Sequence, residues 1–242
     1  MLLFFANSLI DGYLFSNFTG KAIVVLQIIS SIFMFAVIIG KMSQLRSVNR
    51  EMRRFRRDFD SEHDVLEYYL VRRPSTKVGL EGIYKETCER LIKLISPDVR
   101  TLLVGRNTEN GGEAALTARE IELVRGSCEH ALDEAQLCLE YGMGVIATVV
   151  SLSPMLGLLG TVWGVLDAFY AMGTAGSANL ATIAPSISSA LVTTVIGLFV
   201  AIPGVAFYNA INSRVRTMSS SMEAFADELI GRVACEFQGR SS

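Results

Sequence analysis

Charged side chains are missing from long stretches of this chain, and that absence is its most informative feature. Residues 22–40 contain none, and residues 141–213 contain a single one, Asp167. A helix needs about 20 apolar residues to cross the hydrocarbon core of a bilayer. The amphipathic helix of a soluble domain keeps a polar face, which these stretches lack. We therefore expect an all-α integral membrane protein with three transmembrane helices.

Cysteine and histidine are also scarce. The chain has four cysteines, two histidines and no C-x-x-C pair, too few in this pattern for a disulfide framework or a zinc site. The formal net charge of −2 gives no sign of nucleic-acid binding. The uncharged stretches contain no nucleophile–base set and no cluster of metal ligands, which argues against a membrane enzyme or a metal transporter. We expect no catalytic residue, no metal and no cofactor.

Basic residues near the ends of the uncharged stretches predict how the chain crosses the membrane. Residues 41–57 carry seven lysines and arginines, residues 209–216 carry two, and residues 173–182 carry none. Basic residues accumulate on the cytoplasmic side and anchor to lipid headgroups there. The bias predicts an N-terminus outside the cytoplasm and a C-terminus inside it.

The predicted order has seven parts. Residues 1–21 are expected to be retained at the interface, because no basic residue precedes their apolar start and no small-residue cleavage pattern follows it. The remaining parts are a first span (22–40), a cytoplasmic helical domain (41–141), a second span (142–172), a periplasmic turn (173–182), a third span (183–208) and a cytoplasmic helical tail (209–242).

Regular apolar spacing predicts helices outside the spans as well. Prolines at positions 74 and 97 mark two of their ends, because the residue before a proline disfavours helical conformation. Single helices are expected over residues 48–73 and 80–95, from 116 toward the second span, and from the third span through 205–234, with a loop at 105–112.

Small and hydroxyl-bearing residues recur at spacings of three and four within the second and third spans, which places them on one face of the second helix and on two overlapping stripes of the third. Such a face permits close packing of membrane helices. Its hydroxyls can also line a polar path without a buried charge. The residues alone leave both interpretations open. They are Pro154, Gly157, Thr161, Gly164 and Ala168 in the second span, and Ser186, Ser189, Ala190, Thr193, Thr194, Gly197 and Ala201 in the third.

Two blocks within these spans resemble a known family. Residues 154–165 read PMLGLLGTVWGV, and residues 183–209 read IAPSISSALVTTVIGLFVAIPGVAFYN. They resemble the second-span and third-span signatures of the TolQ/ExbB family of bacterial inner-membrane proton-channel subunits, in the same order and at a matching separation. The first span, the basic loop and the helical tail are similar to the family's layout. Residues 58–130 resemble the family only in their general character and not in a specific motif.

The resemblance implies a homopentamer in the bacterial inner membrane, built around transmembrane helices of a small TolR/ExbD-type partner. In the family, an aspartate of that partner carries the proton, and the complex uses the proton-motive force to work a TolA-type or TonB-type protein. The channel subunit supplies pore-facing threonines, which fall on Thr161 and Thr194 here. We add Ser189 and Thr193 to the expected proton pathway, Gly157, Gly160, Gly164 and Gly197 as packing positions, and Pro154 and Pro203 as helix kinks.

One position departs from the family pattern. Many relatives carry a glutamate in the third span where this chain has Ser189. Either the partner's aspartate suffices, which we favour, or Asp167 near the outer mouth of the second span compensates by taking up protons. The alternative interpretation of Asp167 is a water-facing carboxylate at the membrane interface, where the second span ends.

These observations favour a TolQ-like subunit, and the short N-terminal segment is the reason for preferring that branch. An ExbB-like subunit that powers TonB-dependent uptake is the alternative within the family. A non-conducting scaffold that gathers partner helices is the alternative outside it. Flagellar stator relatives have four spans, whereas three are expected here.

Overall fold

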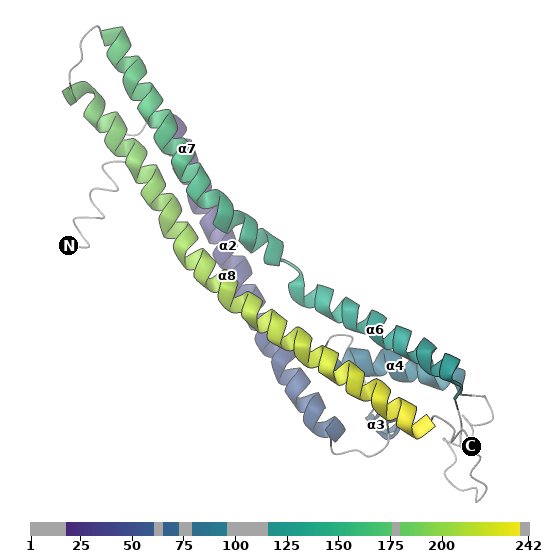
Figure 1. Ribbon diagram of the computed structural model, residues 1–242. Coiled ribbons are helices and arrows are strands. Elements are labelled where there is room, and N and C mark those ends of the chain that lie inside the picture. The colour runs from purple at the N-terminus through teal and green to yellow at the C-terminus, as the bar shows by residue number, and fades with distance from the viewer. Residues whose placement is uncertain (1–17, 61–64, 73–78, 96–115, 176–179, 238–242) are drawn as a thin grey trace, which may run out of the picture. The chain divides into compact units, whose positions relative to one another are not determined.

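The computed structural model describes residues 18–60, 65–72, 79–95, 116–175 and 180–237, and its regular elements there are α-helices (Figure 1). They are α2 (Phe18–Asp60), α3 (Glu67–Arg72), α4 (Leu80–Leu94), α6 (Ala118–Glu140), α7 (Met143–Ala175) and α8 (Leu180–Phe237). Three helical stretches among the described residues are long and apolar enough to cross a membrane, which confirms the predicted class. Most of the N-terminal segment expected at 1–21 and the loop expected at 105–112 lie outside the described residues.

The helices form two compact units. The membrane unit comprises residues 1–42 and 142–212, and the polar unit comprises residues 43–141 and 213–242. α2 and α8 each contribute one part to both units. The prediction that the third span continues as one long helix is confirmed, because α8 is helical from Leu180 to Phe237.

The prediction of a single helix over residues 48–73 is wrong. α2 already contains residue 48 and ends at Asp60, and α3 begins at Glu67 after a turn at Val65 and Leu66. The two turn residues are 2% and 3% exposed, and the Tyr84 hydroxyl donates to the Val65 carbonyl. Burial of this turn outweighs the local helical periodicity, as tertiary contacts often do.

Five aromatic rings from four helices form the centre of the polar unit. Phe55 and Phe59 of α2, Tyr68 of α3, Tyr84 of α4 and Phe225 of α8 are each at most 7% exposed. Phe225 lies 5.6 Å from Phe55 and 5.2 Å from Phe59 between ring centroids, in edge-on arrangements. Aromatic pairs of this geometry stabilise a core beyond the area that they bury.

α6 begins at a capping box, and a glycine separates its end from α7. The Glu120 backbone N–H donates to the Thr117 hydroxyl at 3.3 Å, and the Thr117 N–H donates to the Glu120 carboxylate at 2.8 Å. That backbone hydrogen bond lowers the pKa of Glu120. α6 ends at Glu140, and Gly142, with φ of 83°, separates it from α7. A positive φ suits glycine because no Cβ clashes there.

α4 packs against α6 and contributes a buried thiol to the polar unit. Cys88 is 0% exposed and is a free cysteine, as is the buried Cys128 of α6. Burial raises the pKa of Cys88 to about 12. A thiol in that state is protonated at neutral pH and unreactive, as a structural cysteine should be.

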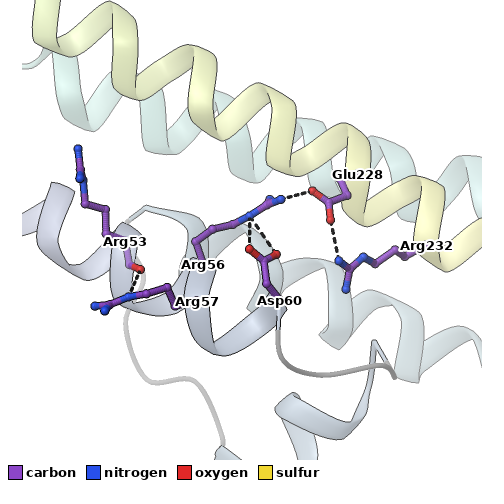
Figure 2. Close-up of polar contacts among 6 residues, drawn as sticks. All are labelled: Arg53, Arg56, Arg57, Asp60, Glu228 and Arg232. Carbon is purple, nitrogen blue, oxygen red and sulfur yellow. Dashed lines mark hydrogen bonds and ion pairs between the residues drawn. The ribbon is translucent and has the colours of Figure 1, made fainter.

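A chain of ion pairs links α2 to α8 within the polar unit (Figure 2). Arg56 contacts Asp60 at 3.1 Å and Glu228 at 2.5 Å, and Glu228 also contacts Arg232 at 2.7 Å. Partial burial alone would raise the pKa of Glu228. Its hydrogen bonds and ion pairs with the two arginines outweigh burial and lower that pKa.

Replacing Glu228 with glutamine should weaken the dependence of stability on acid. Because the folded-state pKa of Glu228 is lowered, its contribution is complete above its unfolded value of about 4.3 and is lost as pH falls through the folded value. The side chains are about a third exposed, so the contribution is about 1 kcal/mol or less. Between pH 7 and pH 3, the melting temperature should fall more steeply for the unmodified protein than for Glu228→Gln.

The matched control for this measurement is Glu122→Gln. Glu122 lies 3.5 Å from Arg125 on α6, and its side chain is 75% exposed, so its charge should matter little at any pH. Identical acid dependence in the unmodified protein and Glu228→Gln would rule out a stabilising role for the pair.

Candidate functional site

Glycines on α7 bring its backbone against α8 in the membrane unit. A Cβ atom added at Gly157 would lie 2.9 Å from the Cα of Thr194, and one added at Gly160 would overlap the side chain of Thr193. Cβ atoms do not approach other heavy atoms this closely, so the contact requires glycine at both positions. The two helices run side by side along this stretch (Figure 1).

Two further close approaches extend the contact between α7 and α8. A Cβ atom at Gly164 would lie 2.5 Å from the Cβ of Ala190, and one at Gly197 would lie 2.6 Å from the carbonyl oxygen of Ser153. All four positions assigned to packing from the sequence therefore lie where α7 meets α8.

Thr161 and Thr194 place their hydroxyls next to each other in this contact. The Thr194 hydroxyl donates to the Gly157 carbonyl at 2.9 Å, and its oxygen lies 3.5 Å from that of Thr161. The Thr161 hydroxyl lies 2.7 Å from the Leu158 carbonyl of its own helix. Both side chains are partly exposed, and a hydroxyl oxygen that donates can still accept a further hydrogen bond. A polar group from another chain can therefore reach this pair.

The other two hydroxyls predicted for the pathway are more deeply buried. Thr193 is 1% exposed, and its hydroxyl lies within 3.2 Å of the Gly157 carbonyl and 2.7 Å of the Ala190 carbonyl. Ser189 is 6% exposed and donates to the Ser186 carbonyl at 3.0 Å. Within this chain, both hydroxyls satisfy helix carbonyls and are less accessible than Thr161 and Thr194.

One polar residue at this site, Gln27 of α2, was not predicted from the sequence. Gln27 is 0% exposed, and its Nε2 donates to the Ser153 carbonyl at 3.2 Å, beside Gly197. Its Oε1 is buried with no hydrogen-bond partner among the described residues. A buried oxygen without a partner costs about 1–3 kcal/mol of stability. Gln27 is the only amide side chain within residues 22–40, which was the available signal.

The remaining predicted residues lie elsewhere on the same helices. Asp167 is partly exposed on α7, six residues after Thr161. Pro154 lies inside α7 and Pro203 inside α8, and both helices continue through them. Proton uptake at Asp167 and kinks at the prolines stay predictions.

The chemistry available at this site is hydrogen bonding. The described residues contain no cluster of histidine, cysteine, aspartate or glutamate that could hold a metal ion. Asp167 is the only charged residue between 143 and 208. A carboxylic acid from another chain could gain and lose a proton here without being fixed in an ion pair. Fold and site together define a class of multi-pass helical membrane protein whose paired spans present hydroxyls instead of charges.

Proteins with similar sequences narrow this class. Residues 102–224 match the MotA/TolQ/ExbB proton channel family. The Tol-Pal system protein TolQ of Haemophilus influenzae is 33% identical over 225 residues, which cover 90% of each chain. The Pseudomonas aeruginosa TolQ is 44% identical over 98 residues (40% of this chain, 42% of TolQ), and the Neisseria gonorrhoeae biopolymer transport protein ExbB is 29% identical over 190 residues (78% and 79%).

The chain belongs to the MotA/TolQ/ExbB proton channel family. That membership and the three membrane-capable helices make it a protein of the bacterial inner membrane.

Replacing Gly157 with alanine should weaken the contact between α7 and α8. The new Cβ would press on the α8 backbone at Thr194, which cannot rotate away as a side chain could, and overpacking of this kind costs about 1–3 kcal/mol. Thermal unfolding of the purified protein in detergent should therefore occur at a lower temperature. Gly144→Ala is the matched control, because a Cβ there meets nothing within 4 Å. Equal melting temperatures for the two variants would contradict the packing role.

Proposed function

We propose that this chain is the proton-conducting subunit of an inner-membrane complex that is powered by the proton-motive force. The observation that carries the proposal is the hydroxyl pair of Thr161 and Thr194, whose oxygens lie 3.5 Å apart and whose side chains are partly exposed. A hydroxyl can donate to an ionised carboxylate and can accept from a protonated carboxylic acid. A lysine or arginine would instead hold the acid in its charged form, and residues 143–208 contain neither.

The proton-carrying group itself comes from a partner in this proposal. Threonine and serine hydroxyls do not titrate near neutral pH, so they relay protons only for a group that does. We assign that group to an aspartate on the transmembrane helix of a small, single-span TolR/ExbD-type subunit. Five copies of this chain surround the helix, and the complex works a TolA/TonB-type protein that acts on the outer membrane. Family membership and the names of the relatives support this assignment.

Ser189 agrees with a pathway in which the partner supplies the only carboxylate at the depth of Ser189 in the membrane. Its hydroxyl donates to the Ser186 carbonyl, so it stands as a neutral, satisfied group where many relatives have an acid. Uptake of protons at the partly exposed Asp167 is the alternative, and Asp167→Asn separates the two. Unchanged proton flux in that variant would favour the partner's aspartate acting without Asp167.

The direction of transport requires a defined topology, and we propose an N-terminus outside the cytoplasm with the polar unit and the tail inside. The seven basic residues of 41–57 support this orientation. It puts the connection between α7 and α8 at the periplasmic surface. Labelling of a single cysteine introduced at Gly173 by a membrane-impermeant reagent in intact spheroplasts checks this assignment.

The TolQ-like branch is favoured over the ExbB-like branch by the extent of similarity. The Haemophilus influenzae TolQ matches over 90% of this chain, and the Neisseria gonorrhoeae ExbB over 78%. A deletion of the gene that damages outer-membrane integrity would support the TolQ-like branch. A deletion that abolishes TonB-dependent uptake instead would support the ExbB-like branch. Neither branch involves enzymatic chemistry, and we propose none for this chain.

Proton flux into liposomes tests the proposal directly. The chain is purified with the small single-span protein that accompanies it and is reconstituted with a pH-sensitive dye trapped inside. Under an imposed membrane potential, the complete complex should acidify the lumen, and this chain alone should not, because it lacks the titrating aspartate. A complete complex that passes no protons would leave only the scaffold hypothesis.

A further inference from the structure

The polar unit contains a cavity of about 760 Å³ that the proton pathway does not use. It lies between the part of α2 that begins at Leu45 and the part of α8 that begins at Ser213, and Leu80 of α4 completes its wall. This volume is in the range of pockets that bind drug-sized molecules, and it is far larger than inorganic phosphate requires.

One side of the cavity is basic and rich in hydrogen-bond donors. Arg46, Asn49 and Arg53 follow one another at spacings of three and four on α2, so they share a face of the helix. Thr217 and Ser221 are spaced by four on α8 and line the cavity opposite them. Two guanidinium groups and an amide form a donor set that suits phosphate oxygens, whereas the two hydroxyls already donate to the Ser213 and Thr217 carbonyls of α8.

No residue that the structure describes neutralises the charges of Arg46 and Arg53. Among the described residues, no hydrogen bond or ion pair involves either guanidinium group. Figure 2 shows Arg53 extending away from the ion pairs that Arg56 makes with Asp60 and Glu228. The neighbouring Arg56 is thus already paired with two carboxylates, whereas the guanidinium group of Arg53 can bind a ligand.

The floor of the same cavity is apolar. Leu45, Met52, Leu80 and Met218 line it, and they are between 2% and 6% exposed. A ligand that satisfies both surfaces has an anionic head and a hydrocarbon tail. A free anion would make no use of the apolar lining, and an uncharged detergent would leave the arginines without a partner.

The position of the cavity along the chain indicates where such a ligand comes from. Leu45 follows the end of the predicted first span by five residues, and Ser213 follows the end of the third by five. At 1.5 Å per helical residue, both are within about 8 Å of the span ends, which is the depth of the lipid headgroups. Phospholipid is the amphipathic anion present at that depth.

We propose that this cavity is a binding site for an anionic phospholipid, with the phosphate held by Arg46 and Arg53 and an acyl chain on the apolar floor. The side-chain amide of Asn49 donates to a further phosphate oxygen. The site is independent of the proton pathway, because none of its residues belongs to α7 or to the part of α8 that carries Thr194. Proton flux can therefore fail without affecting lipid binding.

Lipid binding is measured on the full-length chain in a non-ionic detergent, by native mass spectrometry during titration with a short-chain phosphatidylglycerol. Arg46→Gln together with Arg53→Gln should weaken binding about tenfold or more. Arg50→Gln together with Arg54→Gln removes the same charge from the same helix outside the cavity, and should change affinity less than about twofold. Because all four arginines are exposed, both double variants should fold. Circular dichroism checks that their helix content equals that of the unmodified protein. If the first does not, Arg53→Gln alone should still weaken binding about fivefold.

Two competitors distinguish the sources of the anion. A phosphatidylcholine of the same chain length should bind at least about tenfold more weakly, and inorganic phosphate at the same concentration should not displace the lipid. The proposal is overturned if the cavity variants bind like the unmodified protein, or if the control variants lose as much affinity. Equal binding of phosphatidylcholine or displacement by phosphate would overturn it too, by showing apolar adsorption or a free-anion site.

Discussion

Thr161→Val and Thr194→Val, made separately, should assemble normally and lose proton conduction. Valine keeps the branched shape of threonine and removes the hydroxyl. Thr194→Val loses the donor to the Gly157 carbonyl and leaves the Thr161 hydroxyl without its neighbour at 3.5 Å. Either change puts a methyl group where the partner's carboxylic acid would find a hydrogen-bond partner. Proton flux in liposomes should fall about a hundredfold, the lower end of what a positioned proton-transfer group contributes.

The stability of these variants should change little, which separates conduction from folding. An interhelical hydrogen bond in a membrane protein contributes about 0.6 kcal/mol on average, so assembly should survive its loss. Thr148→Val is the matched control, because Thr148 is an exposed threonine of α7 whose hydroxyl donates to the Gly144 carbonyl of its own helix at 2.8 Å. Wild-type flux in both Thr161→Val and Thr194→Val would reject the relay role and favour a non-conducting scaffold.

Phe225→Ala should destabilise the polar unit by about 3–5 kcal/mol. Phe225 is 1% exposed, its ring packs edge-on against Phe55 and Phe59, and the Arg56 guanidinium lies 5.8 Å from its centroid. Truncation leaves a cavity among aromatic rings that cannot close around it. Because whole domains are stable by only about 5–15 kcal/mol, the loss should be visible as early unfolding in denaturant and as faster proteolysis of the polar unit.

Two companion variants test whether this loss is due to the aromatic core. Phe225→Leu keeps most of the volume and should cost about 1.5 kcal/mol or less. Leu123→Ala truncates a residue of α6 that is 44% exposed and should also cost little. The core assignment is wrong if Phe225→Ala is no more destabilising than Leu123→Ala.

The spans and most helices can be predicted from the sequence because each is determined by a large energetic effect that acts within a short segment of chain. A charge at the centre of a membrane helix is costly, so the uncharged stretches mark the spans without knowledge of the fold. Pro97 fixes a limit for α4, which is helical over Leu80–Leu94, and the absence of proline after Pro203 agrees with one helix to Phe237.

Features that depend on contact between distant segments were harder to predict. The turn at Val65 and Leu66 interrupts a helical pattern because these side chains are buried in the polar unit. Thr193 and Thr194 are adjacent in sequence, yet a helix turns about 100° per residue, and only one of the two remains partly exposed. Helical spacing gives a face for each span but not the register between spans, which decides that Gly160 meets Thr193 and Gln27 meets Ser153.

Native mass spectrometry of the gently solubilised complex tests most directly whether hydroxyl-bearing spans from several copies surround another protein's carboxylic acid. We predict an assembly of five copies of this chain that retains at least one small single-span subunit with an aspartate in its transmembrane helix. A monomer with no small companion polypeptide would contradict this prediction, because the hydroxyls of Thr161 and Thr194 would then have no titrating group to serve.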